Sequence, residues 1–463
     1  MPTLLAGKSD WLRDYRPVVA IATPIAGIQL AQVALTTVDL AMMGLLGVTA
    51  IAAGGMAILL YNQLRTMSVG MVTGLGNQIA GAVGRGEART GTEDLDDRAR
   101  DEIRDLVRAG LFVATIVAVG AAALLIGLGF ALQWFGQRHE VVEAARPMMI
   151  ALAPGLLPML WLNVLRQFAV GMRRPGSLLR VTLVSIAVNA ALNAAFIYGW
   201  LGLPQLGTTG VGVATTLVQV FTLVAFHRQI RRDPQLAGLL ATDWWTLDRA
   251  TVRSILTMGT PIAFTYGNEA AITSVATVLM GAFGPAVLAA GNIVNQLAYI
   301  VYQLNIGLSQ GSSILVSRSV GRGHRSEAAH IARRALTVAV AIMTVIAVIY
   351  CLIPGAVLAP FLHDDDSAEV VATATTLLWF AIAHQYLKGT QNICVGLLRG
   401  LGNTTSSLRI TLIGYWGIGI PVMLVAAYAL HWHGYGVWLG LCAGFGATAV
   451  LLARQFRTDL HKA

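Results

Sequence analysis

Few ionisable side chains interrupt the long apolar segments of this sequence, and two of them are carboxylates. Asp39 lies in the apolar segment 24–55, and Glu269 lies in a second one, 261–291. A carboxylate within hydrocarbon is costly unless it faces a cavity or has a partner, so both acids are functional candidates. Each could exchange protons or bind a cation. For Asp39 the alternative is an interfacial residue that caps the turn before Gly44, whereas Glu269 lies too deep in its segment for capping.

Two asparagines form a second polar feature inside another apolar segment. Asn189 and Asn193 are spaced i, i+4, and side chains at this spacing share one face of a helix. An amide in apolar surroundings is costly unless it is hydrogen-bonded. Two interpretations follow from the residues alone. The amides either join neighbouring helices by hydrogen bonds or line a binding site.

The segments that carry these residues are long enough to be membrane helices. The 463 residues are 56% hydrophobic and only 12% charged, and the mean hydropathy is +0.67. Apolar runs of this length cross a hydrocarbon core of about 30 Å as helices, which satisfy their own backbone hydrogen bonds. We predict an all-α polytopic membrane protein with twelve transmembrane helices. The predicted spans are 16–44, 51–83, 106–132, 147–172, 177–200, 208–229, 255–283, 286–317, 330–358, 370–398, 405–430 and 435–456.

The net charge of +9 is distributed as expected for such a protein. Basic residues gather before the first span and after each even-numbered span, and the intervening loops are nearly free of them. Because positively charged loops stay on the cytoplasmic side, we predict that both termini are cytoplasmic, in a bacterial inner (plasma) membrane. The basic residues therefore orient the chain, and no nucleic-acid partner is expected.

Motifs of several other protein classes are missing from the sequence. The N-terminus has no cleavable signal-peptide pattern, and the three cysteines, Cys351, Cys394 and Cys442, have no metal-ligand spacing. No P-loop and no HExxH motif occurs. We therefore expect no enzyme, no cofactor and no ATP-driven pump.

The second half of the chain repeats the first. Pro24 and Pro261 are 237 positions apart (261 − 24), and the tripeptide GRG at 84–86 recurs at the same distance at 321–323. Six predicted spans fall in each half and both halves start on the same side of the membrane. This arrangement is a parallel repeat with its axis along the membrane normal.

The repeat also predicts the domain organisation. A polar, aromatic stretch that contains Trp244 and Trp245 separates the two halves. We predict an N-lobe at 1–230, a cytoplasmic linker at 231–253 and a C-lobe at 254–463. A site between or within two such lobes would be open to each side of the membrane in turn.

Several motifs occur in order along both halves of the chain. They are P…Q…D…MG in the first span, GRG at 84–86 and 321–323, NAALNAAFIYG at 189–199, LGTTGVGVATTLVQ at 206–219 and VGLLRGLGNTTSS at 395–407. With these motifs the sequence resembles a known family, the multidrug and toxic compound extrusion (MATE) transporters, and within it the norfloxacin-exporter (NorM-like) branch. The resemblance implies two pseudo-symmetric six-helix lobes that form a V. It also implies export of cationic amphipathic compounds, driven by inward flow of protons or sodium.

The resemblance assigns a cation or proton site to the N-lobe. Asp39 matches the aspartate of that site, Asn189 and Asn193 match its fifth-span residues, and Thr215 matches its sixth-span threonine. Where some relatives place a second acid, this chain has Asn193. A site with one carboxylate should hold a cation weakly, so we predict coupling to protons rather than sodium. A weak sodium site at these four residues stays open.

In the C-lobe the chain departs from the family pattern. Glu269 matches the seventh-span glutamate of a cation site, but the position of its usual aspartate partner is Lys388. An ammonium there would repel sodium and could pair with Glu269. Either protonation or a cationic drug breaks this pair during transport, or the pair is a permanent clasp between helices.

Other polar and aromatic residues inside the spans are candidates for the substrate cavity. Arg65 lies too deep to reach the membrane surface and needs a buried partner, whereas Arg166 lies close enough to the cytoplasmic end to extend to it. The candidates for the substrate cavity are Gln32, Tyr61, Asn163, Tyr266, Asn292, Tyr299, His384 and Gln391.

Together these features predict a secondary antiporter that exports small organic cations and drugs in exchange for H+ or Na+. We expect a monomer that contacts membrane lipid. Within transporters the alternative is a lipid-linked saccharide flippase, for which Lys388, Arg65 and Arg166 would supply the cationic cavity. From a different class, the alternative is an ion channel.

Overall fold

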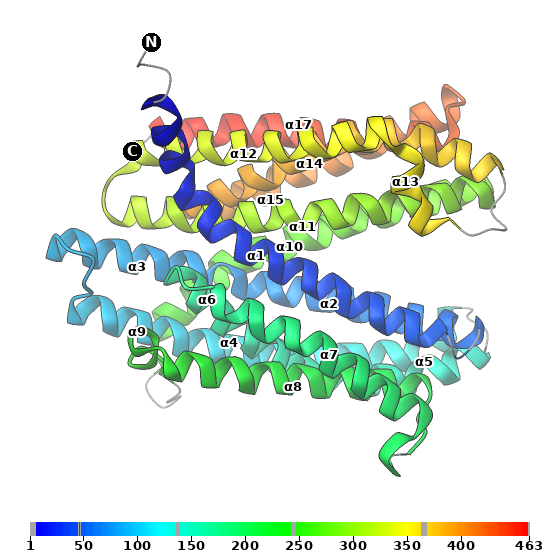
Figure 1. Cartoon of the computed structure of the whole chain (residues 1–463), viewed down its shortest axis with the longest axis horizontal. Coiled ribbons are helices and arrows are strands. Elements are labelled where there is room, and N and C mark those ends of the chain that lie inside the picture. The colour runs from blue at the N-terminus through cyan, green and yellow to red at the C-terminus, as the bar shows by residue number, and fades with distance from the viewer. Residues whose placement is uncertain are drawn as a thin grey trace. The chain divides into compact units, whose positions relative to one another are not determined.

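The structure is a computed structural model that describes residues 6–44, 46, 48–135, 139–202, 204–241, 247–362 and 368–461. Its regular structure is helical, and no β-strand occurs in these ranges, which confirms the predicted all-α class (Figure 1). The helices are α1 (Ala6–Gly44), α2 (Val48–Thr73), α3 (Leu75–Thr90), α4 (Asp97–Ala131), α5 (His139–Leu152), α6 (Leu156–Gly171), α7 (Gly176–Tyr198), α8 (Thr208–Arg232), α9 (Pro234–Ala237), α10 (Arg249–Ala282), α11 (Pro285–Gly321), α12 (Arg325–Leu352), α13 (Pro354–Leu358), α14 (Ala368–Gly400), α15 (Thr404–Leu412), α16 (Ile420–Leu424) and α17 (His433–His461).

Nine helical stretches of the described residues are long and apolar enough to cross a membrane, judged by length and composition. Three further helices, α2, α10 and α11, have 26, 34 and 37 residues and overlap the three predicted spans that these nine stretches do not cover. The number twelve therefore stays a prediction. Trp244 and Trp245, which belong to the predicted linker, lie outside the described residues.

Several predicted spans contain interruptions that hydropathy does not reveal. The second span divides at Gly74 into α2 and α3, and the fourth divides at a 3₁₀ turn, Ala153–Gly155, which contains Pro154. The eleventh has π-helical stretches at Ile413–Gly419 and Val425–Ala429 on either side of α16. Proline removes a helix hydrogen bond, and π-helical turns are common where a helix backbone is disturbed.

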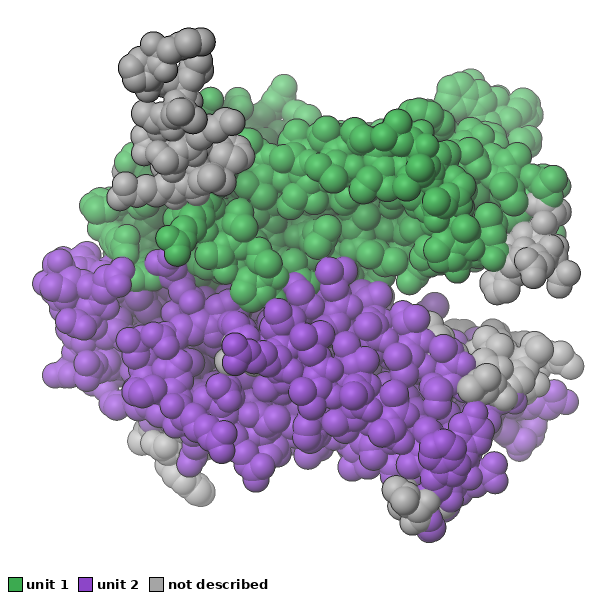
Figure 2. Space-filling view, viewed as in Figure 1, with its two compact units in different colours: residues 1–26, 265–463 green, residues 27–264 purple. Residues whose placement is uncertain are grey.

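The chain divides into two compact units, which Figure 2 colours separately. Unit 2 comprises residues 27–264, and unit 1 comprises residues 1–26 with 265–463. Thus α1 passes into unit 2 at Gly27, and α10 passes into unit 1 at Thr265. This division does not decide the predicted lobe boundaries, which stay predictions.

Unit 2 is a bundle with one continuous apolar core. In it α7 packs against α8, α5 against α2 and α8, and α6 against α4 (Figure 1). Buried side chains such as Leu75, Leu125 and Phe168 fill the space between these helices. The first part of α10 joins the same unit, because Gly259 lets its backbone approach Met71 of α2.

Unit 1 is organised around the pair α11 and α14. Small residues bring these helices together: a Cβ on Gly396 would lie 2.4 Å from the hydroxyl of Ser309. That hydroxyl donates to the carbonyl of Asn392 at 2.7 Å. Close backbone contact through small residues and interhelical hydrogen bonds is typical of membrane helices.

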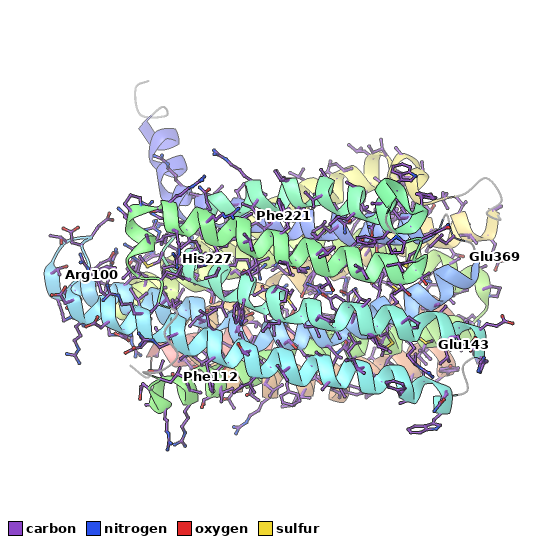
Figure 3. The ribbon with its side chains drawn as sticks, turned by 90° about the horizontal axis from the view of Figure 1, so that it is seen from below. Arg100, Phe112, Glu143, Phe221, His227 and Glu369 are labelled. Carbon is purple, nitrogen blue, oxygen red and sulfur yellow. The ribbon has the colours of Figure 1, made fainter. Side chains whose placement is uncertain are left out.

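The surface of unit 2 has charged ends and an apolar middle. In Figure 3, Arg100 and Glu143 lie at opposite ends of the unit, with Phe221 between them. Exposed apolar side chains of α4, such as Ile116 and Val119, continue this apolar surface. Large exposed apolar surfaces mark contact with lipid or protein, and here they fit a helix bundle within a membrane.

The turn between α3 and α4 is fixed by charged residues outside the apolar surface. Asp96 caps α4 by accepting a hydrogen bond from the backbone of Ala99 at 3.1 Å. The Arg89 guanidinium donates to Asp96 at 2.6 and 2.9 Å, and this hydrogen bonding lowers the pKa of Asp96 to about 2. Arg85 forms a further ion pair with Glu102.

Candidate functional site

Asp39 lies at the centre of a hydrogen-bonded cluster in unit 2. Its Oδ1 accepts hydrogen bonds from Nδ2 of Asn193 at 2.7 Å and from Nδ2 of Asn189 at 3.0 Å. The Thr215 hydroxyl lies 3.3 Å from Oδ2 of Asp39. Asp39 is only 7% exposed and is therefore buried within unit 2. The four residues that the sequence singled out therefore come together.

Three helices position this cluster. Asp39 comes from α1, the asparagines from α7 and Thr215 from α8, where its hydroxyl also donates to the carbonyl of Val211 at 2.9 Å. The i, i+4 spacing of Asn189 and Asn193 lets one amide hydrogen-bond the other at 3.3 Å. Both amides thus face the same carboxylate, as a shared helix face requires.

The amides of the cluster present donors to Asp39. Their Nδ2 groups point at the carboxylate, whereas Oδ1 of Asn193 is buried and has no hydrogen-bond partner among the described residues. Such an oxygen can accept a hydrogen bond from a protonated carboxyl group, or it can ligate a cation. No group of three or more His, Cys, Asp or Glu that could hold a metal ion occurs in the described residues.

Asp39 lines a cavity of unit 2. The empty space of this cavity, together with the part that is open to solvent, has a volume of about 960 Å³. Three predicted cavity residues, Gln32, Tyr61 and Asn163, line it. Tyr61 is 5% exposed and its hydroxyl has no partner among the described residues. Asn163 donates to the carbonyl of Met159 at 2.9 Å. The cavity therefore combines apolar walls with a few polar groups, as sites for small molecules do.

Two hydroxyls of the cavity were missed by sequence reasoning. Ser185 and Thr222 line the cavity and lie 2.7 Å apart. A sequence signal existed for Ser185, because it precedes Asn189 by one helical turn and so continues the polar face of α7. Thr222 follows Thr215 by seven residues on α8 and carries the same kind of signal.

Two arginines of unit 2, the half-buried Arg65 and the buried Arg166, also line this cavity. Nε of Arg65 donates to Oδ1 of Asn62 at 3.1 Å, which supplies the partner that the sequence could not name. Arg166 is only 3% exposed. The expectation that Arg166 extends to the membrane surface is therefore wrong, because the side chain is buried inside unit 2 and lines the cavity instead.

Glu269 and Lys388 form an ion pair in unit 1. Nζ of Lys388 lies 3.3 Å from Oε1 of Glu269, and the two side chains are 14% and 10% exposed. Glu269 comes from α10 and Lys388 from α14. The pairing that the sequence left open is therefore present. Isolated charges at such depth are costly, and a paired charge reduces that cost.

Aromatic rings complete the surroundings of the Lys388 ammonium. Nζ lies 4.2 Å from the ring centroid of Tyr302 on α11 and 5.1 Å from that of Phe445 on α17. Both distances fall within the range of cation–π attraction. Phe445 was not identified from the sequence, because an aromatic residue in an apolar span carries no distinguishing signal.

His384 lies one turn before Lys388 on α14 and is 4% exposed. Its ring meets Trp438 and Phe445 edge-on, at centroid distances of 5.6 and 5.0 Å. Neither ring nitrogen has a hydrogen-bond partner among the described residues. His384 thus belongs to the same cluster of side chains as Lys388.

The remaining predicted cavity residues of unit 1 are Tyr266, Asn292, Tyr299 and Gln391. The hydroxyl of Tyr266 accepts a hydrogen bond from Nη1 of Arg399 at 3.1 Å. Gln391 is buried, and its Oε1 has no partner among the described residues. Asn292 is exposed, and Tyr299, which is 43% exposed, stacks on the ring of Tyr302 at a centroid distance of 6.4 Å. The role of these four residues in a cavity stays a prediction.

Comparisons with known proteins relate this chain to others in sequence and in fold. The sequence model of the MatE family matches residues 24–195 and 261–425. A probable multidrug resistance protein NorM of Pseudomonas aeruginosa is 33% identical over 452 residues, which cover 97% of this chain and 90% of the relative. A probable multidrug resistance protein NorM of Rhizobium meliloti is 32% identical, with 98% and 96% covered. In fold, the crystal structure of the eukaryotic MATE transporter AtDTX14 matches with a TM-score of 0.83 at 18% identity, covering 97% of this chain and 98% of that one.

Proposed function

Because the chain belongs to the MatE family, we propose that it is a secondary antiporter that exports cationic amphipathic compounds in exchange for protons. The family consists of integral membrane transporters, and the two bacterial relatives compared above are named probable multidrug resistance proteins. The proposal places the protein in the inner membrane with both termini in the cytoplasm, in keeping with its basic loops.

The observation that carries the proposal is the position of Asp39. Among the described residues that line the cavity of unit 2, Asp39 is the one acid. The residues that donate hydrogen bonds to it, Asn189, Asn193 and Thr215, carry no charge. A proton and a cationic substrate would both be attracted to this carboxylate. Since one negative charge cannot be neutralised by both at once, binding of one favours release of the other, which is the requirement for exchange.

The orientation of the amides supports protons over sodium. Sodium would need oxygen atoms around it, but Asn189 and Asn193 turn their Nδ2 groups toward Asp39. These groups stabilise the ionised carboxylate, because hydrogen bonds to an ionised partner are roughly twice as strong as neutral ones. Protonation of Asp39 would weaken them. Proton uptake would therefore loosen α1 from α7 and α8, which gives it a mechanical effect within unit 2.

The first test is the variant Asp39→Asn, which keeps the shape of the side chain and removes its charge. We expect loss of drug export in resistance and ethidium-efflux assays, with normal expression, because neither a proton nor a cation can be exchanged. Asp248→Asn is the matched control, since Asp248 is an exposed carboxylate that caps α10 through the backbone of Thr251 at 2.9 Å. Export at the wild-type level from the Asp39 variant would refute the role of this acid.

A second candidate function is carriage of an anionic, lipid-linked saccharide. The observation in its favour is that Arg65 and Arg166 line the same cavity as Asp39. In that case Arg65→Gln would abolish function, and Asp39→Asn would leave it intact. The proposed antiporter predicts the opposite order, so the two variants measured side by side separate the two functions.

A further inference from the structure

The ammonium of Lys388 is enclosed in unit 1 in the way that proteins bind organic ammonium ligands. We propose that Glu269, Tyr302 and Phe445 form an ammonium-binding site, that the Lys388 side chain occupies it as a tethered ligand, and that organic ammonium compounds compete with Lys388 for it. The proposal concerns residues apart from Asp39, and it stands whether or not Asp39 couples protons.

The chemistry of the surroundings selects an ammonium. One oxygen, Oε1 of Glu269, lies 3.3 Å from Nζ. The other two groups are ring faces, of Tyr302 at 4.2 Å and Phe445 at 5.1 Å. A carboxylate with aromatic faces is the arrangement that recognises alkylated ammonium ions. A sodium ion needs a shell of oxygen ligands, whereas the groups that face Nζ are one carboxylate oxygen and two ring faces.

The site is built by four helices, which fix its walls. Glu269, Tyr302 and Phe445 come from α10, α11 and α17, and Lys388 extends from α14. Next to Lys388, Gly389 lets α14 approach the side chain of Asn305 on α11. The walls are therefore held by helix packing, whereas the ammonium is held by a flexible four-carbon stem. A tethered ligand of this kind can leave while the site keeps its shape.

Two further titratable side chains lie beside the ring of Phe445. His384 on α14 meets this ring edge-on at 5.0 Å, and Tyr415, from the π-helical stretch before α16, lies 4.9 Å from it. Lys388 provides the cation that balances Glu269. If Lys388 leaves, the carboxylate is buried without a partner, which is costly. An incoming ammonium removes that cost, so exchange of one ammonium for another is more favourable than simple opening of the pair.

The first experiment removes the tethered ligand and supplies it from solution. Lys388→Ala deletes the atoms of a propylammonium ion. We expect propylammonium to raise the thermal unfolding midpoint of the purified variant by several degrees more than sodium chloride at equal ionic strength. The wild type should show no such difference, because Lys388 fills the site. The double variant Lys388→Ala/Glu269→Gln should also show none, since the carboxylate is missing.

Lys388→Met is the control for packing, because it fills the space without a charge and should not respond to propylammonium. Equal stabilisation of Lys388→Ala by sodium and by propylammonium would overturn the proposal in favour of a plain cation site. Absence of any stabilisation in Lys388→Ala would overturn the ammonium site itself.

The second experiment uses the wild-type side chain and does not depend on folding of the Lys388→Ala variant. The sequence contains three lysines, Lys8, Lys388 and Lys462. In a Lys8→Arg/Lys462→Arg background, acetylation of Lys388 can be followed by mass spectrometry, with the N-terminal amine as internal control. We expect slow acetylation of the protein alone and a severalfold faster reaction when tetramethylammonium, which cannot itself be acetylated, is added. A rate unchanged at saturating cation would show that Lys388 is a permanent clasp and would overturn the competition.

Discussion

At the scale of single residues, the two buried carboxylates differ in the kind of partner that each has. Asp39 accepts hydrogen bonds from neutral amides and a hydroxyl, so its negative charge is solvated but not neutralised. Glu269 is paired with the ammonium of Lys388. A solvated, unneutralised acid remains available to a proton or a cation from outside. A paired acid becomes available only when its partner moves.

A prediction at this scale concerns the charge at position 193. Nδ2 of Asn193 lies 2.7 Å from Oδ1 of Asp39, so Asn193→Asp would place two carboxylates within hydrogen-bonding distance. Two such groups cannot both ionise without a shared proton or cation. We expect this variant to gain stabilisation by sodium. Sodium at a hundred times its Kd would contribute about 2.7 kcal/mol, measured by thermal unfolding in sodium chloride against N-methylglucamine chloride.

The matched control is Asn193→Leu, which adds no charge and should show no response to sodium. A sodium response of the wild type equal to that of Asn193→Asp would contradict the preference for protons. No response in either protein would show that these four residues cannot form a cation site even with a second acid.

At the scale of helices, small residues decide where the functional side chains lie. On α14, Gly396 and Gly400 face serines of α11, and Ser317 donates to the carbonyl of Gly400 at 2.9 Å. This contact brings α14 close enough to α11 for Lys388 to reach the ring of Tyr302. We therefore expect the proposed ammonium site to be sensitive to changes in the α11–α14 contact.

The corresponding prediction compares two glycine-to-alanine changes. A Cβ at Gly396 would lie 2.5 Å from the carbonyl oxygen of Ser309, so Gly396→Ala must push α14 from α11. We expect a loss of about 1–3 kcal/mol of stability, as for overpacked cores. Gly120→Ala on α4 is the control, because nothing lies within 4 Å of a Cβ there. It should be neutral, or stabilising by up to about 1 kcal/mol through helix propensity.

Thermal unfolding of both variants in one detergent provides the measurement. If Gly396→Ala were as stable as Gly120→Ala, the α11–α14 contact would be looser than described. The proposed link between this contact and the Lys388 site would then fail.

At the scale of the whole molecule, the two units have related helices but different sites. Each unit receives part of α1 and part of α10, and the prolines Pro24 and Pro261 lie just before the points where these helices change unit. Unit 2 contains a cavity with an unneutralised acid, and unit 1 contains an acid that an internal cation already occupies. We infer that the units divide the work, with coupling assigned to unit 2.

This division predicts which gradient drives transport. In proteoliposomes, a proton gradient should drive ethidium movement, and a sodium gradient of equal size should not, because Asn189 and Asn193 turn Nδ2 donors toward Asp39. The Asp39→Asn protein should respond to neither gradient. Ethidium movement driven by sodium alone would reverse the assigned ion. Downhill ion flux that continues without any exchange would instead identify a channel.

The sequence by itself determined the all-α membrane class, the internal repeat, the family, and the residues around Asp39 and Glu269. Hydropathy, helical spacing and the cost of charge in hydrocarbon act along the chain and predict the class and the buried acids. Resemblance to the MATE family implied which residues, such as Thr215 and Lys388, accompany these acids. The i, i+4 spacing alone, for example, placed Asn189 and Asn193 on one face.

Only the tertiary structure decided which side chains from different helices meet. The aromatic face of Phe445, the hydroxyl of Thr222 and the burial of Arg166 depend on how helices rotate and approach one another. Apolar packing fixes that rotation through the shape of many neighbours at once. For this reason one span's sequence does not reveal which of its polar or aromatic residues will face a carboxylate or a cavity.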